Sequence, residues 1–336
     1  MHGKPMDIIM VTPASPGSRA GNRATADRWQ RLLEQSGHRV SVMTKYEGEP
    51  CDLMIALHAW RSHAAIKTFR RKWPELPLIV VLTGTDIYRY QHRDPAPTRE
   101  SMTLADVLVG LHDLVGEDIA PEFHSKLVTL YQSAAAVPAR PRDGQSAGFD
   151  VCVIGHLREE KDSLRAAMAA RLLPPESRIR VLCAGKAHDS QWQQRARTEM
   201  AENSRFLWYG ELGSEDTENL LAQSQLMVIS SVMEGGANVV SEACRAGIPV
   251  IASDIPGNRG LLGQGYAGYY PVTDTQALAR LLVRAETDSR FLHTLTRQVR
   301  ELASRFTPER ERRSLEQVLD LARQRRQPRT VVSPSE

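Results

Sequence analysis

The stretch LMVISSVMEGGANVVSEACRAGIPVIA, residues 226–252, places two short apolar runs on either side of an amphipathic segment. The runs Leu226 to Ile229 and Val250 to Ala252 have the length of buried strands. Two glycines at 235 and 236 interrupt the pattern before a helix that starts near Ala237. A strand, a helix and a second strand of this kind make one unit of a parallel sheet.

The same alternation runs along almost the whole chain in two series, which predicts an α/β fold with doubly wound sheets. Strands of the first series are expected at Ile8 to Val11, Val40 to Met43, Leu53 to Leu57, Leu78 to Leu82, Val107 to Val109 and Leu127 to Leu130. Those of the second are expected at Val151 to Ile154, Ile179 to Cys183, Phe206 to Trp208, Leu226 to Ile229, Val250 to Ala252 and Ala267 to Tyr270. Helices are expected between them, among them Ala24 to Gln35 and Ser62 to Lys72, with Ser62 as a capping residue.

The chain has 336 residues, enough for two domains. Residues 134–149 have two prolines, two glycines and no periodicity, so we expect the linker there. An N-terminal domain would then span 1–140 and a C-terminal domain 148–306, with a ligand cleft between the carboxyl ends of their strands. The Arg-rich segment 307–326 is expected to be a helix that packs back on the N-terminal domain, with its charges on a solvated face.

Composition narrows the class of protein. The chain is 41% hydrophobic and 25% charged, which is typical of a soluble enzyme. Its net charge of +3 is too small to indicate a nucleic-acid partner. Four scattered cysteines form no metal-binding or disulfide pattern, and no apolar stretch has the length of a membrane span. We therefore expect a cytoplasmic protein with no bound metal and no resident cofactor.

Residues 234–242, EGGANVVSE, have the features of a diphosphate site. Glycines allow the backbone to approach a ligand closely, and the first amides of a helix attract anions. Glu242, inside that helix, is placed to accept hydrogen bonds from a ribose, while Glu234 would face the group beyond the phosphates. The expected donor-binding residues of this segment are Gly235, Gly236, Ala237, Asn238, Val239 and Glu242.

This segment resembles the E-x7-E motif of the family 4 glycosyltransferases. That family has the GT-B fold, two facing Rossmann-like domains, and takes sugars from nucleotide donors. Residues 12–21 resemble its glycine-bearing first loop, and residues 150–161, DVCVIGHLREEK, lie where it has a phosphate-binding segment. The resemblance assigns Gly21 and Gly155 to donor binding and Lys161 to the diphosphate, with Glu234 also in the catalytic set.

One position departs from the family pattern. His156 stands where the family usually has arginine. Because histidine carries a full charge only when protonated, stabilisation of the leaving group should depend more on Lys161 and on Arg158. A capping or packing role for His156 is as compatible with the sequence as a catalytic one.

Three further motifs, at residues 16–29, 56–62 and 82–88, together with GHLREEKD at 155–162, resemble the selenosugar synthases of selenoneine biosynthesis. The resemblance implies a UDP-sugar donor, usually UDP-N-acetylglucosamine, and selenophosphate as acceptor. It covers roughly residues 6–325. The products would be a 1-seleno-sugar, UDP and phosphate.

The residues themselves suit such an acceptor. Each motif lies at the end of an expected strand of the first domain, so the three loops should face the same cleft. Cations and hydrogen-bond donors that gather at one place favour a small, highly charged oxyanion. The expected acceptor-binding residues are Ser15, Arg19, Asn22, Arg23, His58, Arg61, Thr83, Thr85 and Asp86. For Asp86 three roles stay open: capping a helix, orienting an arginine, or acting as a base.

Two other functions are compatible with the chain. One is transfer of a sugar to a hydroxyl of a small metabolite or lipid, although no amphipathic, Lys-rich stretch indicates a lipid-facing surface. The other is nucleotide-sugar binding without turnover, which the many acceptor-side groups disfavour.

Overall fold

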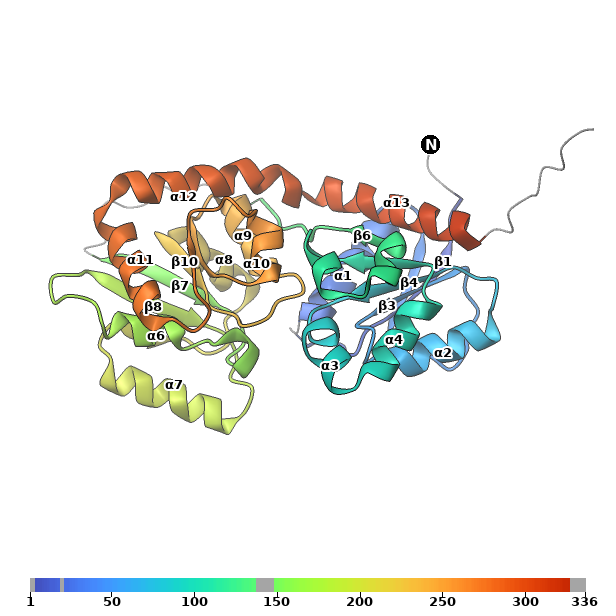
Figure 1. The fold of residues 1–336 in the computed structure, drawn as a ribbon, viewed down its shortest axis with the longest axis horizontal. Helices are drawn as coiled ribbons and strands as arrows, with labels where there is room; N and C mark the ends of the chain where they lie inside the picture. Colours follow the sequence, from blue (N-terminus) through green and yellow to red (C-terminus); the bar gives the residue numbers. More distant parts are fainter. Residues whose placement is uncertain (1–3, 19–20, 137–147, 327–336) are drawn as a thin grey trace, which may run out of the picture. The chain divides into compact units, whose positions relative to one another are not determined.

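The computed structural model describes residues 4–18, 21–136 and 148–326, which form two compact units (Figure 1). The first unit extends to Leu130 and resumes at Glu309, and the second runs from Tyr131 to Pro308. The division therefore falls after Leu130, whereas residues 137–147 of the expected linker, with the expected boundary at 140, lie outside the described residues. The reason is that Tyr131 packs edge-on against Phe306, whose carbonyl oxygen accepts a hydrogen bond from the backbone of Ala134.

Within the described residues, the first unit is a parallel sheet in the order β2-β1-β3-β4-β5-β6. Its strands are β1 (Asp7–Val11), β2 (Arg39–Met43), β3 (Leu53–Leu57), β4 (Leu78–Leu82), β5 (Val107–Gly110) and β6 (Leu127–Thr129). Its helices are α1 (Gly21–Gln35), α2 (His63–Lys72), α3 (Gln91–Arg93), α4 (Pro95–Leu104), α5 (Val115–Asp118) and α13 (Pro308–Arg326), with a π-helical turn η1 (Asp86–Tyr90) and a 3-10 turn η2 (Pro121–Lys126).

Both faces of this sheet are buried, as the continuous apolar runs predict. Alternate residues of β1 point to opposite sides: Ile8 and Met10 join the core that contains Trp29 of α1, and Ile9 and Val11 join the core that contains Phe69 of α2. The strand ends lie within a residue of the expected ones. Ser62 directly precedes α2 as expected, but its hydroxyl donates to the carbonyl of Leu57 at 2.6 Å and does not cap the helix.

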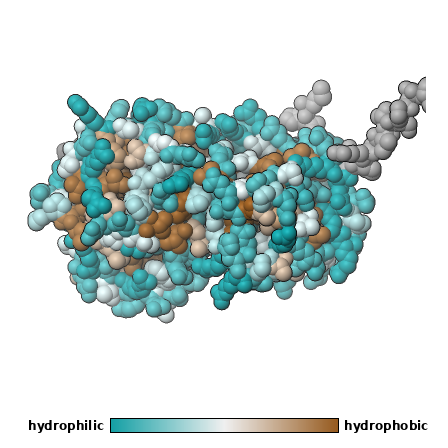
Figure 2. All heavy atoms as spheres, viewed as in Figure 1, coloured by the Kyte–Doolittle hydropathy of each residue, from teal (hydrophilic) through white to brown (hydrophobic). Residues whose placement is uncertain are grey.

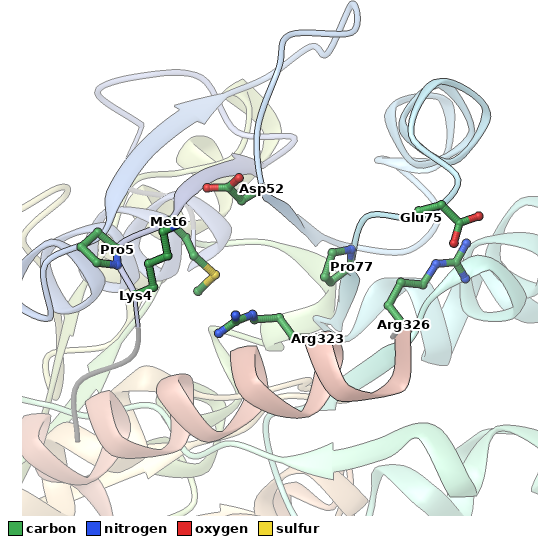
Figure 3. Close-up of a pocket in the computed structure, with 8 residues that line it drawn as sticks. All are labelled: Lys4, Pro5, Met6, Asp52, Glu75, Pro77, Arg323 and Arg326. Carbon is green, nitrogen blue, oxygen red and sulfur yellow. The ribbon is translucent and has the colours of Figure 1, made fainter. Parts of the chain in front are cut away.

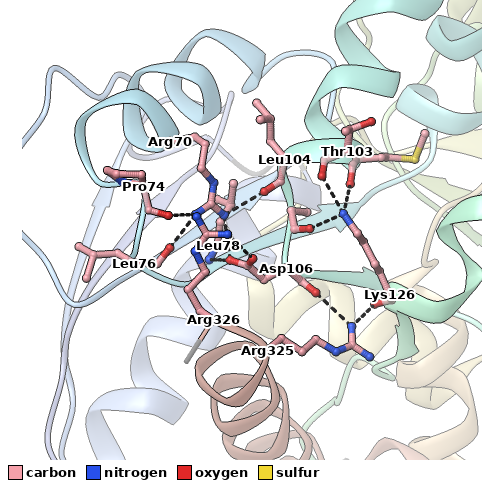
Figure 4. A network of polar contacts seen from close by, with 12 residues as sticks. Arg70, Pro74, Leu76, Leu78, Thr103, Leu104, Asp106, Lys126, Arg325 and Arg326 are labelled. Carbon is pink, nitrogen blue, oxygen red and sulfur yellow. Dashed lines mark hydrogen bonds and ion pairs between the residues drawn. The ribbon is translucent and has the colours of Figure 1, made fainter. Parts of the chain in front are cut away.

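The C-terminal helix α13 is fastened to the first unit at both ends. Near its start, the fully buried Glu311 accepts hydrogen bonds from Trp29 Nε1 at 2.7 Å and Arg28 Nε at 3.0 Å. Near its end, Arg326 pairs with Asp106, which also pairs with Arg70 of α2 (Figure 4). The expectation of a solvated charged face is therefore wrong for these groups, because they hold the helix in place.

The second unit repeats the architecture, again for the part of the chain that is described, in the order β12-β11-β10-β7-β8-β9. Its strands are β7 (Phe149–Ile154), β8 (Ile179–Ala184), β9 (Phe206–Trp208), β10 (Leu226–Ile229), β11 (Val250–Ser253) and β12 (Tyr269–Tyr270). Its helices are α6 (Arg165–Ala170), α7 (Ser190–Glu202), α8 (Ser214–Gln223), α9 (Asn238–Ala246), α10 (Pro256–Leu262), α11 (Thr275–Thr287) and α12 (Ser289–Leu302), with 3-10 turns η3 (Glu159–Lys161) and η4 (Ala303–Phe306).

The surface in Figure 2 is largely hydrophilic, with separate apolar areas. Over the described ranges, the large hydrophobic side chains that are exposed are Met168, Leu172, Leu207 and Tyr209, all in the second unit. The four cysteines have free thiols, and three of them are buried. No helix in these ranges combines the length and apolarity needed to cross a membrane.

Candidate functional site

The carboxyl ends of the strands collect the expected residues in each unit, because parallel strands end at one edge of a sheet. In the second unit the loops after β7, β8 and β10 meet there. Val232 N–H donates to the carbonyl of Glu160 at 2.9 Å, and Ser230 Oγ donates to the carbonyl of Lys161 at 3.1 Å. These bonds dock the loop after β10 onto the turn η3.

Lys161 and Glu234 form an ion pair inside this docked region. Nζ of Lys161 donates to Oε1 of Glu234, and the hydroxyl of Ser231 donates to the same oxygen. The side chain of Glu234 is 7% exposed and that of Lys161 is 21% exposed, so the pair is partly shielded from water. The structure thus pairs the two expected catalytic residues directly. Ser231, which sequence reasoning missed although it lies only three positions before Glu234, is a second donor to the same oxygen.

The other expected catalytic residues lie in the loop after β7. Arg158 precedes η3 and has its Nε 3.9 Å from Glu160, so its ion pair is made within its own loop. His156 is partly buried, and its carbonyl oxygen accepts a hydrogen bond from Ser163 Oγ at 3.3 Å. These contacts are compatible with a packing role for His156 and leave a role toward a ligand as a prediction.

Two glycines bring the loops after β7 and β8 into close contact. A Cβ atom on Gly185, whose φ is +153°, would lie 1.9 Å from the carbonyl oxygen of Gly155. Leu157 N–H then donates to the carbonyl of Lys186 at 2.9 Å, which continues the contact between the loops. The expected donor residue Gly155 is thus part of a crossing that only glycine at 185 permits.

The helix α9 begins at Asn238 with Ala237 as its N-cap residue, as the sequence predicts. Ala237 makes no side-chain capping bond, and the glycines at 235 and 236 lead into this end of the helix. Glu242 lies one turn further along α9 and is partly exposed. This arrangement matches the one expected for a diphosphate and a ribose, whose binding to these residues stays a prediction.

In the first unit, His58 follows β3 with a left-handed backbone, φ 73°, and is almost completely buried. The N–H of Arg61 donates to its Nδ1 at 3.2 Å, so Nε2 carries the hydrogen and donates to Thr85 Oγ1 at 2.9 Å. Burial lowers the pKa of His58, against the opposing effect of the Asp86 charge. His58 is expected among the cations and donors of the acceptor site. These contacts favour a neutral ring that is engaged with Thr85, and a role of His58 toward an acceptor stays a prediction.

Asp86 ties the loops after β3 and β4 together. Its fully buried carboxylate accepts hydrogen bonds from the backbone N–H groups of Ala59, Thr83, Gly84 and Ile87, at 2.8 to 3.2 Å. Of the three expected roles, these contacts favour capping, since Asp86 is the first residue of η1 and both its oxygens are engaged with backbone.

The remaining acceptor candidates lie in the loop after β1, on the first turn of α1 and in the loop after β3. Arg23, on the first turn of α1, pairs with Asp27 at 2.8 Å, and Arg61 is exposed beside His58. Ser15 is exposed and Asn22 is partly buried, whereas Arg19 lies outside the described residues. The expected donor residue Gly21 is exposed at the start of α1.

His112 is a second histidine with the same arrangement as His58, and sequence reasoning missed it. It follows β5 and is fully buried, Leu114 N–H donates to its Nδ1 at 3.2 Å, and its Nε2 lies 2.9 Å from Tyr88 Oη. The two histidines therefore flank the loop after β4 and each contacts a hydroxyl in it. The sequence contains a signal for this pair, because each histidine directly follows a leucine near the end of an expected strand.

A hollow of about 470 Å³ lies at the amino ends of β1, β3 and β4, away from these loops (Figure 3). Its lining mixes both signs of charge: Lys4, Arg323 and Arg326 against Asp52 and Glu75. Among the described residues, no group of three or more His, Cys, Asp or Glu side chains is placed to hold a metal ion.

Part of the chain, mostly in the second unit, is similar to a known family. Residues 144–302 match the model of the family described as "Glycosyl transferases group 1". Over 159 residues the chain is 28% identical to the UDP-Gal:alpha-D-GlcNAc-diphosphoundecaprenol alpha-1,3-galactosyltransferase of Escherichia coli. That match covers 45% of this chain and 40% of the enzyme, so the chain matches less than half of the relative's length.

Solved structures match over nearly the whole chain. HepE of Anabaena, solved with UDP and glucose and with UDP-glucose, has a TM-score of 0.73 at 17% identity, over 94% of this chain and 99% of that one. Sucrose-phosphate synthase of Thermosynechococcus elongatus has the same TM-score at 16% identity, over 94% of this chain and 98% of that one. These likenesses confirm the GT-B fold class.

Proposed function

We propose that this chain, with its glycosyl transferases group 1 domain at residues 144–302, transfers a sugar from a UDP-sugar to a small anionic acceptor, selenophosphate. The observation that carries the donor half is the placement of Lys161 and Glu234 beside the start of α9. A cation and a helix N-terminus together suit a departing diphosphate. The names of the relatives, which include a UDP-galactose-dependent transferase and a protein solved with UDP-glucose, support UDP as the nucleotide.

In the proposed reaction, selenium of selenophosphate attacks C1 of the sugar while the bond from C1 to the diphosphate oxygen breaks. The electron pair of that bond leaves with UDP, and the new bond joins carbon to selenium. Water then cleaves the bond between phosphorus and selenium, which releases phosphate and a 1-seleno-sugar. Lys161 stabilises the negative charge that grows on UDP, an electrostatic role in which a metal ion is not needed.

The acceptor half of the proposal rests on the first unit. Thr85 receives the Nε2 hydrogen of His58, so its own hydroxyl hydrogen is directed elsewhere and is available to an anion. Arg61 is exposed in the neighbouring loop, and Arg23 has a partly exposed aspartate as a counter-ion. Selenophosphate is already anionic and soft, so the reaction needs no strong general base. This suits a loop in which Asp86 is committed to backbone N–H groups.

The experiment is a UDP-release assay with UDP-N-acetylglucosamine and a panel of acceptors. Selenophosphate should be turned over, thiophosphate more slowly and phosphate negligibly, because a pocket of cations and hydroxyls binds all three and nucleophilicity separates them. The E. coli relative is named for transfer to a sugar, so sugars and simple alcohols belong in the panel. Rapid transfer to a sugar or an alcohol, with no turnover of selenophosphate, would mean that the proposed acceptor is wrong and that the proposed glycosyltransferase activity is right. If the chain binds the UDP-sugar but releases no UDP with any acceptor, a nucleotide-sugar binding protein would be favoured.

A further inference from the structure

Glu234 is paired with the ammonium group of Lys161, which the proposed function assigns to the diphosphate. Oε1 of Glu234 accepts from both Lys161 Nζ and Ser231 Oγ. With 7% and 21% of their side chains exposed, the two charges attract each other more strongly than a surface pair does. A diphosphate that reaches Lys161 must therefore displace this carboxylate or bind next to its negative charge.

The backbone of Glu234 cannot withdraw to make room. Gly257 packs against it so closely that a Cβ atom there would lie 2.2 Å from the Glu234 carbonyl oxygen. Lys161 is held from its own side, because its carbonyl accepts the hydroxyl of Ser230. An exchange of partners at this site therefore takes place by rotation of the two side chains.

We propose that Glu234 is the exchangeable counter-ion of Lys161. It holds the ammonium in the empty site, yields it to the diphosphate of an incoming nucleotide sugar, and takes it back as the product diphosphate leaves. The inference rests on the proposed function and adds to it a cause of product release. When displaced, Glu234 can contact the sugar of an intact donor, whereas UDP alone offers it no partner. The exchange therefore weakens the binding of UDP more than that of UDP-sugar.

The test measures nucleoside diphosphate affinity by calorimetry in the full chain. Glu234→Gln removes the competing charge, so the affinity for UDP should rise about threefold to tenfold, the range expected for loss of one partly shielded ion pair. Lys161→Met should lower it, and adding Glu234→Gln to Lys161→Met should change nothing further. Glu159→Gln is the matched control, because Glu159 is an exposed acid in the same turn as Lys161.

Two results would overturn the exchange: an unchanged or lower UDP affinity in folded Glu234→Gln, or an equal gain in the Lys161→Met background, which would indicate simple repulsion. Should Glu234→Gln not fold, Ser231→Ala weakens the hold on Oε1, and absence of any gain in UDP affinity there overturns the inference too. ADP and GDP are measured beside UDP. If one of them binds more tightly, the proposed donor is wrong and the variants are compared with that nucleotide, while no binding of any diphosphate overturns both proposals.

Discussion

Gly155 and Gly185 cross at the carboxyl edge of the second sheet, and a Cβ atom on Gly185 would lie 1.9 Å from the carbonyl oxygen of Gly155. The two glycines belong to loops that follow neighbouring strands, β7 and β8. Backbone cannot give way as the far end of a flexible side chain can. The position of the loop that contains Lys161 therefore depends on the absence of a single methyl group.

Gly185→Ala should lower the free energy of unfolding of the second unit by ~2 kcal/mol or more, because the added methyl group overlaps backbone at a positive φ. UDP affinity should fall with it. Gly265→Ala is the control, since open space surrounds that position. Urea unfolding and calorimetry of both variants check the prediction, and equal stability of the two would contradict the crossing.

Lys161→Met should depress kcat about 100-fold or more while the apparent donor KM changes less, since Lys161 is expected to interact most strongly with the developing charge on UDP. Steady-state kinetics with UDP-N-acetylglucosamine measures both constants. Lys161→Arg, which keeps the charge, should recover part of kcat. Loss of donor affinity at an unchanged kcat would assign Lys161 to binding alone.

Glu242→Ala should weaken UDP binding about 10-fold to 150-fold, which corresponds to roughly 1.5 to 3 kcal/mol for hydrogen bonds between ribose hydroxyls and a charged group. Glu242→Gln keeps an acceptor oxygen and should lose less. Calorimetry with UDP compares them. Because Glu242 is partly exposed on α9, both variants should keep the thermal stability of the parent. Unchanged UDP binding in folded Glu242→Ala would contradict the assignment.

The pKa of His58 predicts a pH dependence of stability. Burial holds this pKa below the ordinary 6.5, so the unfolded chain binds the proton more readily than the folded one. The stabilisation is complete above the ordinary value and is lost as the pH falls toward the folded pKa. His58→Asn, which tolerates a left-handed backbone, should flatten the decline in Tm between about pH 7.5 and pH 5.5. Exposed His293 is the control: His293→Asn should leave the slope as it is.

Glu311→Ala should destabilise the first unit by about 3 to 5 kcal/mol, because it removes the buried acceptor of Arg28 and of the Trp29 indole. Glu309→Ala, at an exposed position in the same first turn of α13, should have little effect. Urea unfolding distinguishes them. Similar losses in the two variants would mean that helix propensity, and not the buried carboxylate, determines how α13 is held.

The strands could be predicted from the sequence, since a run such as Leu53–Leu57 or Leu78–Leu82 is short and apolar at every position, as in a strand covered on both faces. It also determined the start of α9, because Gly235 and Gly236 end one pattern where another begins. These signals depend on residues close together in the chain, so they can be recognised without knowledge of the fold. Two such series in one chain predict two doubly wound domains, while the GT-B class came from the resemblance of residues 234–242 and was confirmed by the solved structures.

Contacts between residues far apart in the chain could not be predicted from the sequence and are seen only in the folded structure. Lys161 and Glu234 are 73 positions apart, and no local pattern states that one carboxylate oxygen serves both this lysine and Ser231. The charge of His58 likewise depends on burial and on the N–H of Arg61, neither of which the residue type reveals. Spacing shows which groups reach the same sheet edge. Whether these groups form ion pairs, lose their charge or become buried depends on free energies of interaction with neighbours that only the folded chain brings close.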